Sequence, residues 1–506
     1  MPNPALNIEV LLEPVRLRRF LQQQRWFGAK ARSIASVQLA DVLDIGDLAW
    51  LTLIRVEFES GVDHEYLLPL AVVDATTAET LQRERPEAAV AVLDDARTLI
   101  DGVFDDGLCR ALLDMLQNGK TCHSRRGTWI PDRRRQHGHV EVDRIGRTAP
   151  DQSNTSILFG ERAILKLFRR VEFGPNPDVE INAFLTRVGF PHVPRTLGML
   201  EYSRRGESPA AVAMLQEFVP NRGNGWEVML DSLASLANDA VAHPADRSRP
   251  SPTTAEALPA LLGQRTGELH VHLARGDDES LAPEPFVGEP LVRAAEEMRH
   301  RADAHLELLA SSLSRLDVAT RRRATEVLDS RAALLDVFTT MAALDDAGLR
   351  IRCHGDYHLG QTLVTDADVV ILDFEGEPLK PLPERRDRSS PLRDVAGMLR
   401  SFSYAATAAA RSRTDDGSNA AAGTLEGWEA GASRLFLSAY FDAVGSHAVL
   451  PAQQRNTDAL LRAYVVDKAI YEIGYELNNR PDWVAIPLTG VLRWADRTST
   501  IPGKLR

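Results

Sequence analysis

The sequence is poor in cysteine and has no long apolar run. Its 506 residues contain three cysteines, Cys109, Cys122 and Cys353, which lie far apart and form no C-x-x-C pair. This spacing indicates neither a disulfide framework nor a zinc site, and it favours a cytoplasmic setting. No stretch approaches the about 18 uninterrupted apolar residues of a membrane span, so we expect none. The start, MPNPALNIEVLLEP, lacks the basic and apolar segments of a signal peptide.

An excess of positive charge is also missing. The formal net charge is −12. Nucleic acids and anionic membranes are bound by clustered positive charge, so neither is expected as the main partner, whereas a small neutral ligand is compatible. Two nucleotide-binding fingerprints are absent as well, the glycine-rich G-x-G-x-x-G and G-x-x-x-x-G-K-[ST]. A Walker-type fold is therefore not expected.

The length of the chain predicts about three folding units. Residues 10–27 favour a helix, and β-formers dominate the runs between residues 37 and 73, which predicts a small α+β module. Residues 88–118 are expected to be mostly helical. We predict an N-terminal subdomain at 1–90, an intermediate subdomain at 91–219 and a helical region at 220–506.

Residues 351–377 carry the groups on which the predicted chemistry depends. Asp356 and Gln361 enclose four residues, and the apolar run 369–372 then delivers Asp373. Transfer of the γ-phosphoryl group of ATP to a hydroxyl needs a carboxylate that deprotonates the hydroxyl and oxygen ligands that hold Mg²⁺. We therefore predict Asp356 as the base, and Gln361 and Asp373 as metal ligands.

Each of these signals also has a plainer interpretation. An isolated H-G-D is common by chance, and an acid at the end of a strand is often a turn former. The order base, amide, strand, acid is the order of the catalytic pieces in protein kinases. Their combination favours a phosphotransfer site.

A lysine in an apolar strand is the first predicted contact with the nucleotide. Lys166 lies among apolar neighbours in AILKLFRR (163–170), where a charge is costly unless it is paired or faces a ligand. In kinases such a lysine holds the nucleotide phosphates and pairs with a helix glutamate. We predict this role for Lys166, with Glu180 as its partner.

Two further segments are expected to contact the nucleotide. One is a polar turn whose N–H and hydroxyl donors would cover the phosphates; it comprises Ser153, Asn154, Thr155 and Ser156. The other is the end of the apolar strand 211–220, where a two-lobed kinase has its adenine-binding hinge; it comprises Gln216, Glu217 and Val219.

The acceptor side is predicted on a helix at residues 461–479. One stripe of this helix is aromatic and charged rather than aliphatic; it contains Tyr464, Lys468, Tyr471, Glu472, Tyr475 and Glu476. Aromatic rings stack on sugars and charged groups bind their hydroxyls. A solvated face with buried tyrosine rings is the alternative.

Several stretches resemble the bacterial maltokinases, which are related to aminoglycoside phosphotransferases and eukaryotic protein kinases. They are QQQRWFGAKAR (22–32), CHGDYHLGQ (353–361), LDFEGEP (372–378), SPLRDVAGMLRSFSYAA (390–406) and DKAIYEIGYELNNRPDWVAIPL (467–488). The resemblance implies a bilobal α+β kinase-like fold with an N-terminal cap subdomain and a mostly helical C-lobe. It also implies transfer of phosphate from ATP, with Mg²⁺, to the anomeric hydroxyl of maltose, for α-glucan and glycogen synthesis.

The resemblance also assigns roles to single residues. His354 joins Asp356 in the catalytic H-G-D. The expected sugar contacts are His358, Asp467, Lys468, Tyr471 and Glu472. Association with trehalose synthase is a possible partnership. The alternatives are a kinase of glucosamine, another hexose or an aminoglycoside, and a catalytically silent partner of trehalose synthase; the silent protein would have lost the base or the metal acids, which are all present here.

Overall fold

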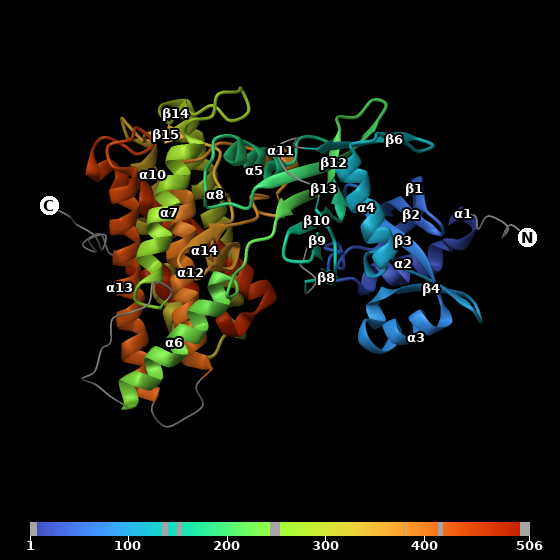
Figure 1. The fold of residues 1–506 in the computed structure, drawn as a ribbon. Coiled ribbons are helices and arrows are strands. Elements are labelled where there is room, and N and C mark those ends of the chain that lie inside the picture. The colour runs from blue at the N-terminus through green and yellow to red at the C-terminus, as the bar shows by residue number, and fades with distance from the viewer. Residues whose placement is uncertain are drawn as a thin grey trace, which may run out of the picture. The chain divides into compact units, whose positions relative to one another are not determined.

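The computed structural model describes residues 8–133, 140–148, 154–242, 254–378, 380–412 and 418–495 (Figure 1). The chain divides into two compact units. The N-terminal unit comprises Met1–Thr186 and Pro194–Pro220, and the C-terminal unit comprises Arg187–Val193 and Asn221–Arg506. Within the described ranges, every helix is too short or too polar to span a bilayer.

The first sheet of the N-terminal unit is antiparallel. Its strands, in spatial order, are β1 (Ile34–Gly46), β2 (Ala49–Phe58), β3 (His64–Asp74), β5 (Arg97–Asp101) and β4 (Ala89–Asp94), and β11 (Arg170–Val171) also pairs with β3. The helices before and between these strands are α1 (Ile8–Leu11), α2 (Pro14–Gln23) and α3 (Ala75–Glu84).

Both faces of this sheet are covered. Alternate residues of a strand point to opposite faces: Trp50 and Ile54 of β2 pack in the same core as the α2 residue Phe20. Leu51 and Leu53 belong to a second core. This second core contains Leu108, Leu112 and Leu116 of α4 (Asp106–Asn118). The strand is therefore an almost unbroken apolar run.

The structure corrects the prediction for residues 88–118. Their first half forms the hairpin β4–β5, and only α4 is a long helix, which begins where Asp105 accepts a hydrogen bond from the N–H of Leu108 at 2.6 Å. The predicted boundary at residue 90 falls inside the first sheet, because β4 pairs with β5 and β5 pairs with β3. Short apolar runs can be read as strand or helix, and here their pairing with the sheet decides.

The second sheet of the N-terminal unit contains Lys166. Its strands, in spatial order, are β6 (Cys122–His123), β7 (Gly127–Arg133), β12 (Thr196–Arg204), β13 (Ala210–Glu217), β10 (Ala163–Phe168), β9 (Asn154–Phe159) and β8 (Ile145–Arg147). Helix α5 (Pro177–Arg187) lies between β10 and β12 along the chain. Lys166 on β10 lies between Ser156 of β9 and Met214 of β13.

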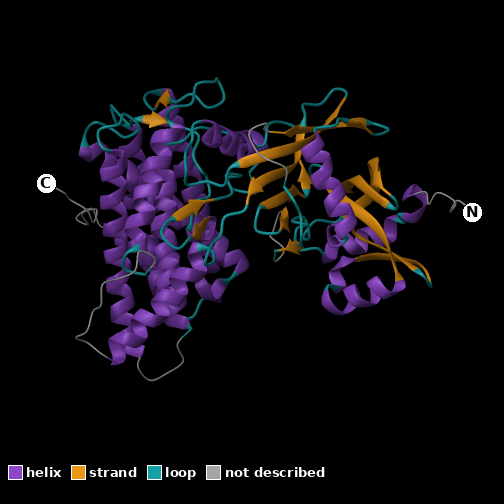
Figure 2. Ribbon diagram, viewed as in Figure 1, coloured by secondary structure: helices purple, strands orange, loops and turns teal. Residues whose placement is uncertain are grey.

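The C-terminal unit is mostly helical, as Figure 2 shows in purple. Its helices are α6 (Gly225–Ala242), α7 (Leu258–Leu273), α8 (Glu289–Ser312), α9 (Val318–Asp329), α10 (Arg331–Ala342), α11 (Leu382–Arg385), α12 (Leu392–Arg411), α13 (Ser418–Val444), α14 (Gln454–Asn479) and α15 (Ala485–Ala495). The unit also contains two small two-stranded sheets. One pairs β14 (Glu284–Pro285) with β15 (Leu349–Arg350), and the other is the hairpin of β16 (Thr362–Val364) and β17 (Val369–Ile371).

Helices α7 and α13 approach each other closely. A Cβ atom on Gly263 would lie 2.1 Å from the carbonyl oxygen of Phe436, and one on Gly267 would lie 2.8 Å from that of Tyr440. Only glycine leaves room for the facing backbone at these two positions. This contact fixes α7, which in turn holds the hairpin β16–β17.

Candidate active site

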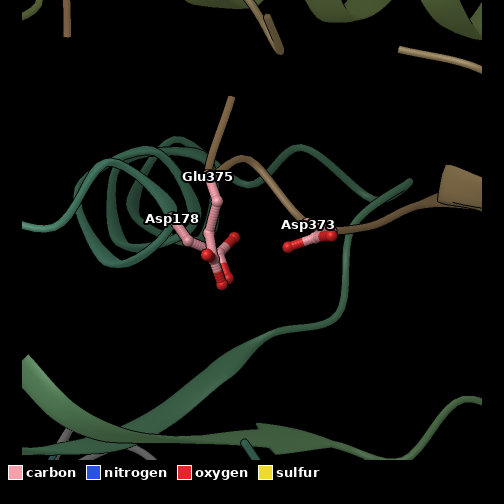
Figure 3. Close-up of side chains that lie close together, drawn as sticks. All are labelled: Asp178, Asp373 and Glu375. Carbon is pink, nitrogen blue, oxygen red and sulfur yellow. The ribbon is translucent and has the colours of Figure 1, made fainter. Parts of the chain in front are cut away.

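The hairpin β16–β17 brings Gln361 and Asp373 to the same end. Thr362 lies opposite Ile371, and the N–H of Leu372 donates to the carbonyl oxygen of Gln361 at 2.9 Å. The next residue, Asp373, has a φ of +66°, in the left-handed region that aspartate tolerates better than most residues. Asp373 and Glu375 both lie on the segment after β17 (Figure 3). The strand predicted between amide and acid is present.

Asp356 lies near the same hairpin end. Burial lowers the pKa of His358, and the charges of both Asp356 and Asp373 act on this imidazole in the opposite direction. His358 Nδ1 accepts a hydrogen bond from the N–H of Gly360 at 3.1 Å, which suits the neutral ring. His358 therefore shapes the turn that carries Gln361, and its contact with the acceptor stays a prediction.

Asp394 of α12 binds the backbone of the H-G-D loop, residues 354–356. Its carboxylate accepts from the N–H of His354 at 2.8 Å and of Gly355 at 2.9 Å, and lies 3.2 Å from His270 Nε2. Burial alone would raise the pKa of Asp394, but the hydrogen bond and charge of His270 outweigh it and the pKa is lowered. Asp394 is thus a buried carboxylate that positions the backbone beside Asp356. Sequence analysis missed this role, because no local pattern joins residue 394 to residue 354.

His354 joins the catalytic loop to the end of β17. It is 1% exposed, and its Nε2–H donates to the carbonyl oxygen of Leu372 at 2.8 Å. Its ring packs against Phe374 and Tyr357, with centroids 4.9 and 5.1 Å away. These contacts join the H-G-D loop to the segment that carries Asp373, and the catalytic role of His354 stays a prediction.

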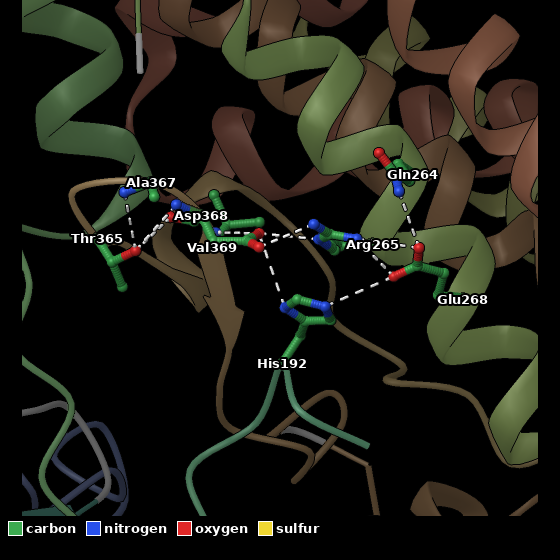
Figure 4. Close-up of polar contacts among 8 residues, drawn as sticks. All are labelled: His192, Gln264, Arg265, Glu268, Thr365, Ala367, Asp368 and Val369. Carbon is green, nitrogen blue, oxygen red and sulfur yellow. Dashed lines mark hydrogen bonds and ion pairs between the residues drawn. The ribbon is translucent and has the colours of Figure 1, made fainter. Parts of the chain in front are cut away.

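A polar network holds the far end of the hairpin (Figure 4). Both carboxylate oxygens of Asp368 accept from Arg265 of α7 at 2.8 Å. His192 lies 3.7 Å from Asp368 and 3.6 Å from Glu268, and its carbonyl oxygen accepts from the N–H of Ile371 at 2.8 Å. The hairpin is therefore fixed to α7 and to residues 187–193.

Helix α14 brings Lys468 to Asp356. Lys468 Nζ lies 3.5 Å from Asp356 Oδ1, and both side chains are 27% exposed. Burial alone would lower the pKa of Lys468, but the carboxylates of Asp356, Glu377 and Glu472 outweigh it and raise the pKa. The lysine is therefore a cation beside the predicted base.

The other predicted sugar contacts on α14 have different surroundings. Asp467 forms an ion pair with Arg301 at 3.1 Å. Tyr471 meets the ring of His305 edge-on, with centroids 5.8 Å apart. Glu472 is buried and pairs with Arg400 at 2.8 Å. The sugar contacts of Asp467, Lys468, Tyr471 and Glu472 stay predictions.

Glu377 forms a second charged group around Lys468. It accepts from Arg393 at 2.7 Å and lies 3.3 Å from Lys380. Burial alone would raise the pKa of Glu377, but the charges of Arg393, Lys380 and Lys468 outweigh it and lower the pKa to about 2. Sequence analysis did not single out Glu377 or Arg393, although both lie in stretches that resemble the maltokinases.

In the N-terminal unit, the ion pair of Lys166 is with Asp178 at 2.7 Å, where the sequence favoured Glu180. Asp178 lies in the first turn of α5 (Figure 3) and its side chain is 1% exposed. The role of Glu180 stays a prediction.

The predicted phosphate-covering turn is mostly strand. Asn154, Thr155 and Ser156 open β9, and Ser153 lies outside the described residues. Thr155 accepts a hydrogen bond from Arg169 at 2.8 Å. The pairing of β9 with β10 explains the difference, because Ser156 lies directly opposite Lys166.

The predicted hinge follows β13. Gln216 and Glu217 end this strand, and Glu217 pairs with Arg195 at 2.6 Å. The N–H of Phe218 donates to the carbonyl oxygen of Arg162 at 3.0 Å. The predicted contacts of Gln216, Glu217 and Val219 with adenine stay a prediction.

A strand lysine paired with a helix carboxylate, an H-G-D loop and a hairpin ending in amide and acid are together typical of a kinase-like phosphotransferase. Comparison with known families agrees. The phosphotransferase enzyme family matches residues 147–432, and the maltokinase N-terminal cap domain matches residues 20–105. The chain belongs to the phosphotransferase enzyme family and carries a maltokinase-type cap.

Individual relatives extend this result. The chain is 30% identical over 343 residues to a glucosamine kinase of Streptacidiphilus jiangxiensis, covering 67% of this chain and 70% of the relative. It is 27% identical over 413 residues to a glucosamine kinase of Mycolicibacterium smegmatis, covering 79% and 92%. A solved glucosamine kinase structure superposes with a TM-score of 0.66 at 21% identity, covering 97% of this chain and 99% of that one.

These findings confirm two predictions. The fold is kinase-like with an N-terminal cap and a helical C-terminal region. The protein is a phosphotransferase that acts on a hydroxyl group. The cap match ends at residue 105, after β5, in agreement with the first sheet rather than with the boundary expected at residue 90.

Proposed function

We propose that this protein is an ATP-dependent sugar kinase that phosphorylates the anomeric hydroxyl of maltose, giving maltose 1-phosphate. The observation that carries the proposal is the meeting of Gln361 and Asp373 at one hairpin end, close to Asp356. Membership of the phosphotransferase family and the kinase names of the relatives support it. A place in α-glucan synthesis and association with trehalose synthase extend the same proposal.

The donor set suits the metal and nucleotide that the family implies. An amide oxygen from Gln361 and a carboxylate from Asp373 are hard oxygen ligands of the kind that Mg²⁺ prefers. When bound, Mg²⁺ neutralises the charge of the nucleotide phosphates and of the phosphoryl group in transfer. Lys166 would bind phosphate oxygens, since its strand position and its pairing with Asp178 hold the ammonium group in place.

Asp356 would act on the acceptor. Its carboxylate accepts the proton of the acceptor hydroxyl while that oxygen forms its bond to the γ-phosphorus and the bond from phosphorus to the β-phosphate oxygen breaks, leaving ADP. Lys468 orients the carboxylate and keeps a positive charge beside it. Asp394 and His354 hold the backbone of the loop, so that little reorganisation is needed during the reaction.

The charges around Asp356 favour a neutral acceptor. Lys468 contacts Asp356 itself, and Glu377, the next carboxylate, is already shared by Arg393 and Lys380. An ammonium group on the acceptor would compete with Lys468 for the carboxylate of Asp356. Maltose carries no charge and avoids this competition. Glucosamine is the second candidate, and the names of the relatives favour it.

A panel of acceptors tests the proposal. Maltose, glucose, glucosamine and kanamycin would be incubated with ATP and Mg²⁺, and the position of phosphate on each product would be read by ³¹P and ¹H NMR. We expect the highest kcat/KM for maltose, with phosphate on the anomeric oxygen. A higher kcat/KM for glucosamine would favour the second candidate, a glucosamine kinase. Absence of phosphoryl transfer to every sugar would refute the proposal that the protein is a sugar kinase.

A further inference from the structure

A cavity lined by arginines lies inside the helical C-terminal unit. Its volume is about 260 Å³, and its lining comes from α9, α12, α13 and α15. A smaller cavity of about 130 Å³ shares Arg400, Glu429 and Arg493 with it. We call the larger one the arginine cavity; its charged lining residues are Arg323, Arg400, Arg411, Glu429 and Arg493.

The most buried of these arginines has unused hydrogen-bonding capacity. Arg400 is 3% exposed, its Nε donates to Glu472 at 2.8 Å, and its Nη1 donates to Ser403 at 3.2 Å. Among the described residues, no acceptor contacts its Nη2. A buried donor without a partner destabilises the folded protein. An acceptor supplied by a ligand would remove this destabilisation.

The carboxylate in the lining is already satisfied. Glu429 accepts from Ser403 at 2.5 Å and from Arg493 at 2.6 Å. Arg411 lies at the exposed edge, where it donates to the carbonyl oxygen of Asp482 at 2.5 Å. Four arginines therefore face one lining carboxylate, and Glu472 behind Arg400 adds only one more negative charge.

We propose that the arginine cavity binds the phosphate monoester of a small molecule. The two positive charges left after Glu429 and Glu472 match the dianion of a phosphate monoester, and guanidinium groups bind phosphate oxygens in a paired geometry. The volume is close to the lower limit of about 300 Å³ for small-ligand pockets, which suits a sugar phosphate better than a nucleotide. Among the described residues, the lining contains none of those assigned to phosphotransfer.

The cavity is connected to the catalytic side through α14. Glu472, the partner of Arg400, lies one helical turn after Lys468, which contacts Asp356. The binding proposal does not depend on the acceptor of the kinase reaction. It can therefore fail while the proposed function stands, and the reverse is also possible.

Calorimetry on the full chain tests the proposal, with glucose 6-phosphate as the probe and saturating Mg²⁺ and ADP in the cell. The variant is Arg323→Gln/Arg493→Gln, which removes two cations from the exposed side of the cavity while leaving Arg400 in place. Its control is Arg322→Gln, the neighbouring arginine on α9, whose side chain is 79% exposed and is absent from the lining. Inorganic phosphate and glucose are titrated in parallel.

We expect glucose 6-phosphate to bind the wild type and the control equally, and the double variant at least about tenfold more weakly, because charge-assisted hydrogen bonds are lost. Binding of inorganic phosphate with the same sensitivity would show that the phosphate group alone is recognised. Glucose should not bind at this site. Equal affinity of the double variant and the wild type, or no binding of either phosphate at millimolar concentration, would overturn the proposal.

Discussion

Each of the two units contains a lysine–aspartate ion pair. The two pairs differ in the distance between the charged atoms and in the exposure of the side chains. Lys166 and Asp178 are 2.7 Å apart, with side chains 11% and 1% exposed. Lys468 and Asp356 are 3.5 Å apart, and each is 27% exposed. A short, buried ion pair fixes both side chains. An ion pair with a longer N–O distance and more solvent exposure leaves the carboxylate free to change partner. The first pair suits a fixed binding lysine, and the second suits a base that must reach a substrate.

The largest expected effect follows from changing the base of the looser pair. Asp356→Asn should lower kcat by about 10³-fold, within the range of about 10² to 10⁴ for loss of general base catalysis. Nucleotide affinity should remain nearly the same. Steady-state kinetics and calorimetry measure both quantities.

Asp366→Asn is the matched control, because Asp366 lies in the turn of the same hairpin with its side chain 89% exposed. Its kcat should equal that of the wild type. Unchanged turnover in Asp356→Asn would remove Asp356 from the role of base.

Breaking the tighter pair should affect stability and nucleotide binding together. Lys166→Met takes the cation away from a buried carboxylate, which costs about 3 to 5 kcal/mol of stability. Chemical denaturation should show this loss in the N-terminal unit. Nucleotide affinity should also fall, as measured by calorimetry.

The double variant Lys166→Met/Asp178→Asn separates the two effects. It should recover most of the stability, because the buried negative charge is gone, but it should not recover nucleotide affinity. Recovery of both would mean that Lys166 serves the fold alone.

The charges around Lys468 predict a dependence of stability on pH. The pKa of Glu377 is lowered from its ordinary value of 4.5 to about 2. Its contribution is therefore complete above pH 4.5 and is lost as the pH falls towards 2. A shift of this size corresponds to about 3 kcal/mol.

Glu377→Gln isolates this contribution. Denaturation of the wild type and the variant between pH 2 and 6 should give a difference in unfolding free energy that grows with pH and levels off above about pH 5. A difference that does not change with pH would contradict the ion-pair assignment.

The smallest effect is expected from the cation of the looser pair. Lys468→Met should change stability by less than about 1 kcal/mol, because partly exposed pairs contribute little. It should still reduce kcat/KM for the sugar by about tenfold, since the lysine orients the base. A stability loss as large as that of Lys166→Met would remove the distinction between the two pairs.

The hairpin β16–β17 could be predicted because its signal is local. Asp356, Gln361 and Asp373 lie within 18 residues of one another, and the apolar run between them predicts the strand. The kinase-like class followed from this order and from Lys166. These features depend on spacing along the chain, which a sequence displays directly.

The supporting contacts could not be predicted, because they join distant residues. Asp394 meets residue 354, and Arg393 meets Glu377, only after α12 has packed beneath the loop. The ion pair of Lys166 with Asp178 depends on the rotation of α5 relative to β10, which the sequence pattern does not give. The strands β4 and β5 became recognisable only through their pairing with each other and that of β5 with β3.

The most direct test of the metal-binding hairpin is the magnesium dependence of nucleotide affinity. Calorimetry would compare ADP binding by the wild type and by Asp373→Ala, each with Mg²⁺ and with EDTA. We predict that Mg²⁺ strengthens binding to the wild type and has little effect on the variant, because the carboxylate ligand is missing. The same magnesium dependence in both proteins would contradict the account of this hairpin as the centre of phosphotransfer.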